Sequence, residues 1–266
     1  MRNIKLVLEY DGTDFSGSQL QANGRTVQGE LEKALASLTG LPAGERCKVS
    51  LAGRTDTGVH ASGQVANFKT ASAHSLETFR RGLNALLPFD IAVLSVEEVD
   101  EEFHARFSAR ERYYRYRILN RPARSPLLRR YALQVAQPLK LEAMQAAANR
   151  LVGEHDFASF AGAGWGIPAG EGAETEENDG PSTVRKVLKA TWSREMPDPA
   201  QTVLVLEIAA NAFLPHMVRN IVGTLLQVGK GEISPDDFEE IIAACDRRRA
   251  GPTAPACGLS LVEVRY

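Results

Sequence analysis

Residues 52–61 read Ala52-Gly53-Arg54-Thr55-Asp56-Thr57-Gly58-Val59-His60-Ala61. Short apolar runs at 49–51 and 65–68 flank this stretch and predict a strand on each side of a loop. Its two glycines let the backbone turn sharply and approach a ligand closely. Between them, Arg54 favours the charged form of Asp56, whereas burial of the carboxylate opposes it. Asp56 is therefore a candidate catalytic carboxylate, and an Asx-turn in an ordinary loop is the alternative interpretation.

Hydrophobic periodicity predicts strands and helices on both sides of this loop. The first half is predicted to run strand, helix, strand, strand, helix, strand, which is the order of a ferredoxin-like unit. The predicted strands are 4–10, 48–51, 64–68 and 91–98, and the predicted helices are 26–40 and 75–88. Thr26 is the expected N-cap of the first helix, Gly40 closes it, and Pro88 ends the second.

The second half has a similar order. Its predicted strands are 112–119, 184–193, 202–210 and 259–266, and its predicted helices are 139–151, 215–228 and 235–245. We therefore predict an α+β fold of two ferredoxin-like (RRM-like) halves, 1–105 and 106–266, whose antiparallel sheets flank a central active-site cleft. Residues 162–181 interrupt the pattern with six glycines and five acids. Few large apolar side chains can order this segment, so we expect a flexible surface loop.

The composition is typical of a globular protein, with 44% hydrophobic and 24% charged residues among 266. No apolar run reaches the length of a membrane span, and the N-terminus leads directly into a strand pattern rather than a signal peptide. We therefore expect a cytoplasmic protein. The three cysteines and five histidines are widely scattered. They form no metal-ligand spacing and no disulfide framework, so no metal is expected.

Basic residues concentrate in one segment, although the net charge is only −2. Between Arg106 and Arg130 there are nine arginines and a single acid, Glu111. Three tyrosines, at 113, 114 and 116, alternate with these arginines. Aromatic rings beside guanidinium groups are typical of proteins that bind single-stranded bases. This segment therefore favours an RNA partner, and a solvated face of salt bridges is the alternative.

Further blocks along the chain form a recognisable set together with residues 53–61. They are Thr26-Val27-Gln28-Gly29, Phe103-His104-Ala105-Arg106-Phe107-Ser108-Ala109 with Tyr114-Arg115-Tyr116, Asn211-Ala212-Phe213-Leu214-Pro215-His216-Met217-Val218-Arg219-Asn220-Ile221-Val222-Gly223, and Gly251-Pro252-Thr253-Ala254-Pro255 with Gly258-Leu259. In sequence and in order, this set resembles the TruA family of tRNA pseudouridine synthases. The resemblance spans nearly the whole chain, which makes the set far more specific than any one block.

The resemblance implies isomerisation of uridine to pseudouridine at positions 38, 39 and 40 of the tRNA anticodon stem-loop. In that reaction the bond from the base nitrogen to the anomeric carbon breaks, the uracil turns, and carbon 5 forms the new bond. The base must leave the helical stack to be reached. No metal, redox cofactor or nucleotide is consumed, so no cofactor is expected. The family also implies a homodimer whose subunits share the tRNA.

The resemblance assigns roles to individual residues. Asp56 matches the catalytic carboxylate, which acts either as a nucleophile or as the base that starts an elimination across the sugar, and the sequence leaves both routes open. Arg54 matches an arginine beside the flipped nucleotide, and Leu259 a residue that walls the base pocket. Tyr114 matches a tyrosine that stacks on the target uracil and helps to move the proton from carbon 5. Without the resemblance, Tyr114 and Leu259 would be interpreted as core residues.

Three other positions need an interpretation. Arg219 lies just outside the apolar stripe of the predicted helix 215–228, so it is either a surface arginine or a cation that pairs with Asp56 and keeps it ionised. His60, a lone histidine, is expected to be structural. Ser18 departs from the family, which usually has Trp after the sequence Phe15-Ser16-Gly17.

Parts of this pattern also occur in two other classes of protein. Asp56-Thr57-Gly58 is the tripeptide of aspartic proteases, but there it directly follows an apolar strand, and the helical periodicities here disagree with an all-β fold. A cation at Arg54 also disfavours a proton shared between two carboxylates. A non-catalytic RNA-binding module is the second alternative. It explains the arginines and tyrosines but leaves the Asp56 motif without a role.

Overall fold

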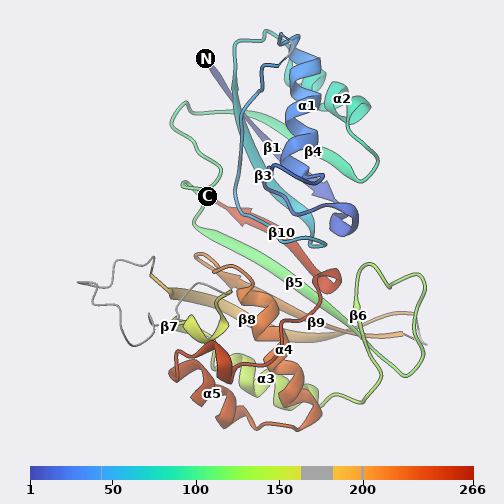
Figure 1. Cartoon of the computed structure of the whole chain (residues 1–266), viewed down its shortest axis with the longest axis vertical. Helices are drawn as coiled ribbons and strands as arrows, with labels where there is room; N and C mark the ends of the chain where they lie inside the picture. The colour runs from blue at the N-terminus through green and yellow to red at the C-terminus, as the bar shows by residue number, and fades with distance from the viewer. Residues whose placement is uncertain (43, 163–181, 199–200) are drawn as a thin grey trace. The chain divides into compact units, whose positions relative to one another are not determined.

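The structure is a computed structural model that describes residues 1–42, 44–162, 182–198 and 201–266. Within these ranges the chain forms ten strands and five α-helices, which confirms the predicted mixed α and β fold (Figure 1). It divides into two compact units, one of Met1–Tyr113 with Leu259–Tyr266 and one of Tyr114–Gly258. The division predicted from the sequence lies between residues 105 and 106 and assigns residues 259–266 to the second half, whereas here they group with the first unit.

The first unit is a ferredoxin-like βαββαβ arrangement. Its elements are β1 (Arg2–Tyr10), α1 (Val27–Thr39), β2 (Val49–Leu51), β3 (His60–Thr70), α2 (Leu76–Leu86) and β4 (Ile91–Val99). Strand β1 lies between β4 and β3, β2 pairs with β3, and all of these pairings are antiparallel. The terminal strand β10 (Leu259–Arg265) pairs in parallel with the start of β3. This pairing explains why the C-terminus groups with the first unit.

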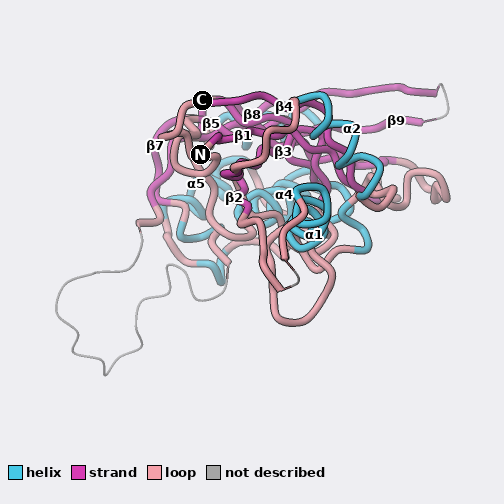
Figure 2. Tube along the Cα trace, turned by 90° about the horizontal axis from the view of Figure 1, so that it is seen from above, coloured by secondary structure: helices cyan, strands magenta, loops and turns pink. Residues whose placement is uncertain are grey.

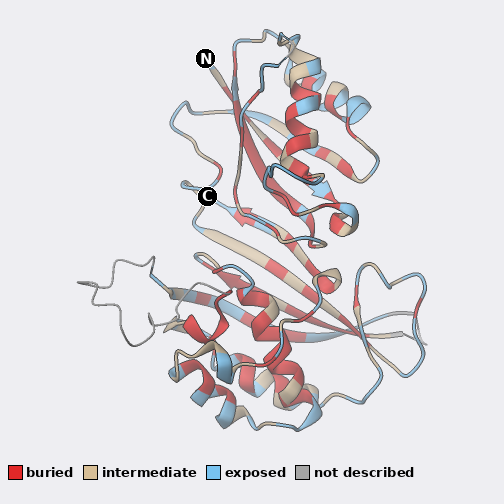
Figure 3. Ribbon diagram, in the orientation of Figure 1, coloured by how far each residue is buried: buried red, intermediate tan, exposed pale blue. Residues whose placement is uncertain are grey.

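Alternation of apolar residues produces the core of this unit. On β1 the side chains of Ile4, Leu6, Leu8 and Tyr10 are all at least 97% buried. Helix α1 lies on one side of the strands (Figure 2), and buried residues line β1, β3 and the inner side of α1 (Figure 3). Thr26 caps the helix by accepting from the Gly29 N–H, and Gly40 ends it with φ 66. Both predicted caps are therefore confirmed.

Segment 100–105 packs against β1 and β3 through two asparagines. The Asn3 amide donates to the carbonyls of Asp100 and Phe103, at 2.8 and 2.9 Å. Asn67 donates to Asn3 Oδ1 and accepts from the Ala105 N–H, both at 2.9 Å. Because these buried amides are satisfied by backbone, they fix the path of the chain as it leaves β4.

The strands of the second unit follow one another in the order β5-β9-β8-β7, with β6 beside β5. Its elements are β5 (Glu111–Asn120), β6 (Leu133–Val135), α3 (Leu141–Asn149), β7 (Gly153–Asp156), β8 (Val184–Asp198), β9 (Gln201–Ala210), α4 (Met217–Lys230) and α5 (Pro235–Ala243). The short strands β6 and β7 were not predicted, because three or four residues show little pattern; β2, which is equally short, was recognised by its apolar residues beside the glycine-containing loop. The predicted segment 162–181 lies, from residue 163 onward, outside the described residues.

Helix α4 is largely buried within this unit. The predicted apolar stripe is buried, as Met217, Ile221, Val222 and Leu225 are fully inaccessible to solvent. Helix α5 begins with Pro235 after a capping box, in which Ser234 and Asp237 exchange side-chain and backbone hydrogen bonds. No helix in the described part of the chain is both long and apolar enough to cross a membrane.

The pairing of β10 with β3 generates a stability prediction. A Cβ atom at Gly63 would lie 2.0 Å from the carbonyl oxygen of Val262 on β10. Gly63→Ala should therefore push the two strands apart and lower the free energy of unfolding by about 3 kcal/mol, measured by urea unfolding. The control is Ser62→Ala at the exposed neighbouring position, where a change within about 0.5 kcal/mol is expected. Equal stability of the two variants would contradict this account.

Candidate active site

Asp56 lies in the loop of residues 52–59 that joins β2 to β3. Its side chain is half-buried, and Arg54, two residues earlier, is exposed. The Val59 N–H donates to the Asp56 carbonyl at 3.1 Å, which closes a tight turn. Gly58 adopts φ 78 in this turn, a left-handed conformation that glycine reaches without strain. The glycine therefore allows the chain to turn directly after the candidate carboxylate.

The residue before Asp56 is held by buried hydrogen bonds. Thr55 is 6% exposed. Its N–H donates to Ser18 Oγ at 2.8 Å, and its carbonyl accepts from the Ser18 N–H at 3.0 Å. Its hydroxyl lies 2.8 Å from the hydroxyl of Tyr10. The Gln64 amide, in turn, donates to the Gly53 carbonyl at 2.9 Å. The first half of the loop is thus fixed to β1, β3 and the segment after β1.

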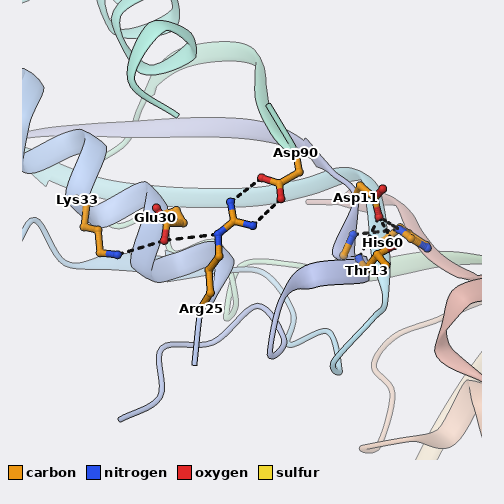
Figure 4. Close-up of polar contacts among 8 residues, drawn as sticks. Asp11, Thr13, Arg25, Glu30, Lys33, His60 and Asp90 are labelled. Atoms are coloured by element: carbon orange, nitrogen blue, oxygen red, sulfur yellow. Dashed lines mark hydrogen bonds and ion pairs between the residues drawn. The ribbon is translucent and has the colours of Figure 1, made fainter. Parts of the chain in front are cut away.

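The end of the loop is fixed by the turn that follows β1. The Gly12 N–H donates to His60 Nδ1 at 3.0 Å, and Asp11 Oδ1 lies 3.2 Å from the same nitrogen. A Cβ atom at Gly12 would lie 1.9 Å from the Val59 carbonyl oxygen, so only glycine fits there. Asp11 also accepts from the Thr13 hydroxyl at 2.5 Å (Figure 4). His60 thus accepts a buried backbone hydrogen bond, the kind of contact expected of a structural histidine.

Leu259 lies near the end of this loop, because β10 pairs with the start of β3. Leu259 is the first residue of β10 and is 5% exposed. The next residue, Ser260, lies opposite His60 at the start of β3. Asp56, Arg54 and Leu259 therefore belong to one unit, with Leu259 beside the strand into which the Asp56 loop leads.

Tyr114 and Arg219 belong to the second unit. The Tyr114 ring is 8% exposed and packs edge-to-face on Phe213, with ring centroids 5.1 Å apart. Arg219 is half-buried and donates from Nε to the Ala254 carbonyl at 2.8 Å. The Ala254 N–H donates back to the Arg219 carbonyl at 3.0 Å. Both side chains are therefore held in a defined orientation within their unit.

The motif at 251–255 is attached to α4 by a polar network that sequence reasoning missed. The Arg247 guanidinium donates to the carbonyls of Ala250 and Gly251 and to Asn220 Oδ1 at 3.0–3.2 Å. The Asn220 side chain is 1% exposed and also accepts from the Thr253 hydroxyl at 2.6 Å. A sequence signal existed, because Asn220 is a polar residue inside the buried stripe of a helix.

Close packing explains the glycine of the same helix. A Cβ atom at Gly223 would lie 1.7 Å from the Pro252 carbonyl oxygen, so the motif contacts the backbone of α4 directly. Behind the motif, Tyr116 is fully buried and its hydroxyl donates to the Pro255 carbonyl at 2.8 Å. Burial strongly raises the pKa of this phenol. Tyr116 is therefore a structural support rather than a surface aromatic.

The basic segment does not present all nine arginines to solvent. Arg112 donates to the carbonyls of Ala52 and Arg106, at 3.2 and 2.8 Å, and so supports the start of the Asp56 loop. Arg115 pairs with Glu207 at 2.9 Å. The exposed members are Arg106, Arg110, Arg124 and Arg129, and the other five are half-buried. The salt-bridge interpretation therefore applies to part of this segment.

No three histidine, cysteine, aspartate or glutamate side chains gather as a possible metal site within residues 1–42, 44–162, 182–198 and 201–266.

Comparison with known proteins places the chain in a family. A family model described as tRNA pseudouridine synthase matches residues 6–108 and 147–266. The chain is 50% identical over its whole length to tRNA pseudouridine synthase A of Roseiflexus castenholzii, covering 91% of that protein. It is 51% identical to the protein of that name from Chloroflexus aurantiacus, with 100% of this chain and 89% of that protein covered. For the Brevibacillus brevis protein, the values are 45% identity and full coverage of both.

The chain therefore belongs to the tRNA pseudouridine synthase family, a family of isomerases, and the resemblance inferred from the motifs is confirmed. Arg54, Asp56, Arg219 and Leu259 all lie inside the matched segments. Tyr114 and most of the basic segment lie in the interval 109–146, which the family model does not match.

The buried Tyr10 contact predicts a pH dependence. Burial raises the pKa of Tyr10 from 10.0 to about 12, so the folded protein keeps this phenol neutral while the unfolded chain ionises. Stability from Tyr10 is thus complete below pH 10 and is lost as pH rises towards 12. By pH 11 the loss should reach about 1.4 kcal/mol. Urea unfolding at pH 8 and pH 11 measures this loss of unfolding free energy, which should be smaller by about 1.4 kcal/mol in Tyr10→Phe than in the wild type. An equal loss in the two proteins would refute the assignment.

Proposed function

We propose that this protein isomerises uridine to pseudouridine at positions 38, 39 and 40 in the anticodon stem-loop of tRNA. Membership of the tRNA pseudouridine synthase family supports the reaction, and the motif resemblance suggests the positions. The observation that carries the proposal is Asp56, a half-buried carboxylate on a loop whose backbone is fixed on both sides by buried hydrogen bonds. Such a loop holds a reacting group in one geometry, which is what catalysis by positioning requires.

Asp56 would supply the chemistry at the sugar. As a nucleophile, its carboxylate attacks the anomeric carbon and displaces the uracil; as a base, it removes a sugar proton and the uracil leaves by elimination. In both routes the uracil departs as a stabilised anion, so no second carboxylic acid is needed to protonate it, unlike the pair used by glycosidases. Carbon 5 then bonds to the anomeric carbon; this releases the Asp56 carboxylate in the first route, and in the second the sugar regains the proton that Asp56 removed. The freed base nitrogen takes up a proton and carbon 5 loses one, so the product is an isomer of the substrate.

The other predicted residues would complete the site. Tyr114 would stack on the uracil, and its edge-to-face contact with Phe213 supports a fixed ring orientation. Arg219 would keep Asp56 ionised, which its anchored guanidinium suits. Leu259 would form a wall of the base pocket, and Arg54, which is exposed, would contact the RNA backbone beside the flipped nucleotide.

The enzyme would bind tRNA as a homodimer, with each tRNA shared between two subunits. Light scattering should then give a particle of twice the chain mass of 29.0 kDa. The protease alternative has lost its support, because five helices disagree with an all-β fold. A non-catalytic RNA-binding module is separated from the enzyme only by an assay of turnover.

Release of tritium from carbon 5 tests the reaction. The substrate is an unmodified tRNA in which the only labelled uridines are at positions 38 to 40. Wild-type protein should release the label to water, and Asp56→Ala should lower the rate at least about 10⁴-fold while tRNA binding persists. Arg219→Met should slow release less severely. The matched control is Asp100→Ala, which removes an exposed carboxylate of the same unit.

Two outcomes would contradict the proposal. No release by the wild type from several tRNAs would leave an RNA-binding module as the function. Equal release from a tRNA labelled only outside positions 38 to 40 would show a synthase that acts at other positions.

Salt dependence tests the basic segment. Arg129 is exposed and should contact a phosphate, so Arg129→Ala should weaken tRNA binding and reduce the slope of log affinity against log salt by about 0.9. Fluorescence anisotropy between 50 and 300 mM salt measures both quantities. Arg80→Ala, which removes an exposed arginine paired with Glu77 on α2, is the control. An unchanged slope for Arg129→Ala would remove this arginine from the tRNA surface.

A further inference from the structure

Ser18, the position at which the chain departs from the family pattern, touches the Asp56 loop. The residue is fully buried. Its N–H donates to the Thr55 carbonyl at 3.0 Å, and its hydroxyl oxygen accepts from the Thr55 N–H at 2.8 Å. Its own carbonyl accepts from the Gln28 N–H at 2.9 Å. Ser18 therefore links helix α1 to the residue that directly precedes the candidate carboxylate.

We propose that Ser18 is a positioning residue: it determines the position of the Asp56 carboxylate by bonding to both the N–H and the carbonyl of Thr55. Two hydrogen bonds to the N–H and the carbonyl of one residue fix the orientation of its backbone. The Tyr10 hydroxyl holds the Thr55 side chain at 2.8 Å, so Thr55 is restrained at three points. Because Asp56 is bonded directly to Thr55, its freedom to shift is small. This inference rests on the proposed role of Asp56.

The Ser18 hydroxyl satisfies a buried donor of the Asp56 loop. The Thr55 N–H needs an acceptor, because an unsatisfied buried donor is costly. A serine hydroxyl supplies the acceptor within a space that has no exposure to solvent. Ser18 thus makes a direct bond to the Asp56 loop that a side chain without an acceptor cannot make.

The segment that carries Ser18 is itself anchored. The Arg25 guanidinium donates to both carboxylate oxygens of Asp90, at 2.6 and 2.8 Å, and its Nε lies 3.8 Å from Glu30 Oε1 (Figure 4). Its Cζ also lies 4.2 Å from the centroid of the Phe15 ring. Gly17 adopts φ 95, and a Cβ atom there would lie 3.0 Å from the Thr55 carbonyl oxygen. The backbone of this segment therefore lies close to the backbone of the Asp56 loop, and Arg25 anchors the end of the segment.

Ser18→Ala tests the proposal, with Ser16→Ala as the matched control in the same segment. Single-turnover tritium release is measured at saturating enzyme, and the dissociation constant for tRNA is measured separately. Ser18→Ala should lower the single-turnover rate about tenfold to hundredfold, because small displacements of a reacting group are costly. The tRNA affinity should stay within about twofold of wild type. Ser16→Ala should leave both quantities unchanged.

Hydrogen exchange adds a readout that does not depend on turnover. In Ser18→Ala the amides of residues 53–58 should exchange at least about tenfold faster, whereas those of β1 should not change. A wild-type rate or unaltered exchange in Ser18→Ala would overturn the inference. So would a variant that loses tRNA affinity at an unchanged rate, since Ser18 would then act in binding. An active wild type with an unaffected Ser18→Ala leaves the proposed function intact, whereas an inactive wild type overturns both.

Discussion

The backbone of Thr55 is the constraint on which the first unit's candidate site depends. Its amide and carbonyl bond to Ser18, and its hydroxyl contacts Tyr10, all within a region closed to solvent. Water cannot replace these partners inside the fold, so each lost bond leaves a buried polar group without compensation. The loop is therefore rigid although it has no regular secondary structure. Asp56 is half-buried and directly follows Thr55. Its position is therefore restrained although it belongs to no strand or helix.

The second unit uses the same device. Residues 251–255 form no helix or strand, yet Arg247, Asn220 and Arg219 bond to their backbone and side chains. Glycines allow the approach in each unit: Gly12 brings the chain against Val59, and Gly223 brings α4 against Pro252. In each unit, one motif segment, 52–59 or 251–255, is irregular and is held to regular elements by buried polar contacts.

Much of the fold followed from periodicity and capping chemistry. The strand β1, the helix α1 with Thr26 and Gly40 at its ends, and the buried stripe of α4 all match their predictions, because each pattern is long enough to show its period. Strands β6 and β7 were missed because they are too short, and their pairing partners lie elsewhere in the chain. From the sequence, the arginines of residues 106–130 form one basic segment. The sequence does not show which of them are paired, because partners such as Glu207 for Arg115 are distant in the chain.

The sequence by itself determined the alternation of strands and helices, the turn at Gly58, and the set of motifs that identifies the family, because these depend on residues close together in the chain. Only the tertiary structure decided which residues hold the Asp56 loop. Tyr10 and Ser18 lie far from it in sequence, and nothing in their spacing indicates that their polar atoms meet Thr55. It also decided that the last strand joins the first unit, because a parallel pairing between β10 and β3 depends on the folded path of the whole chain.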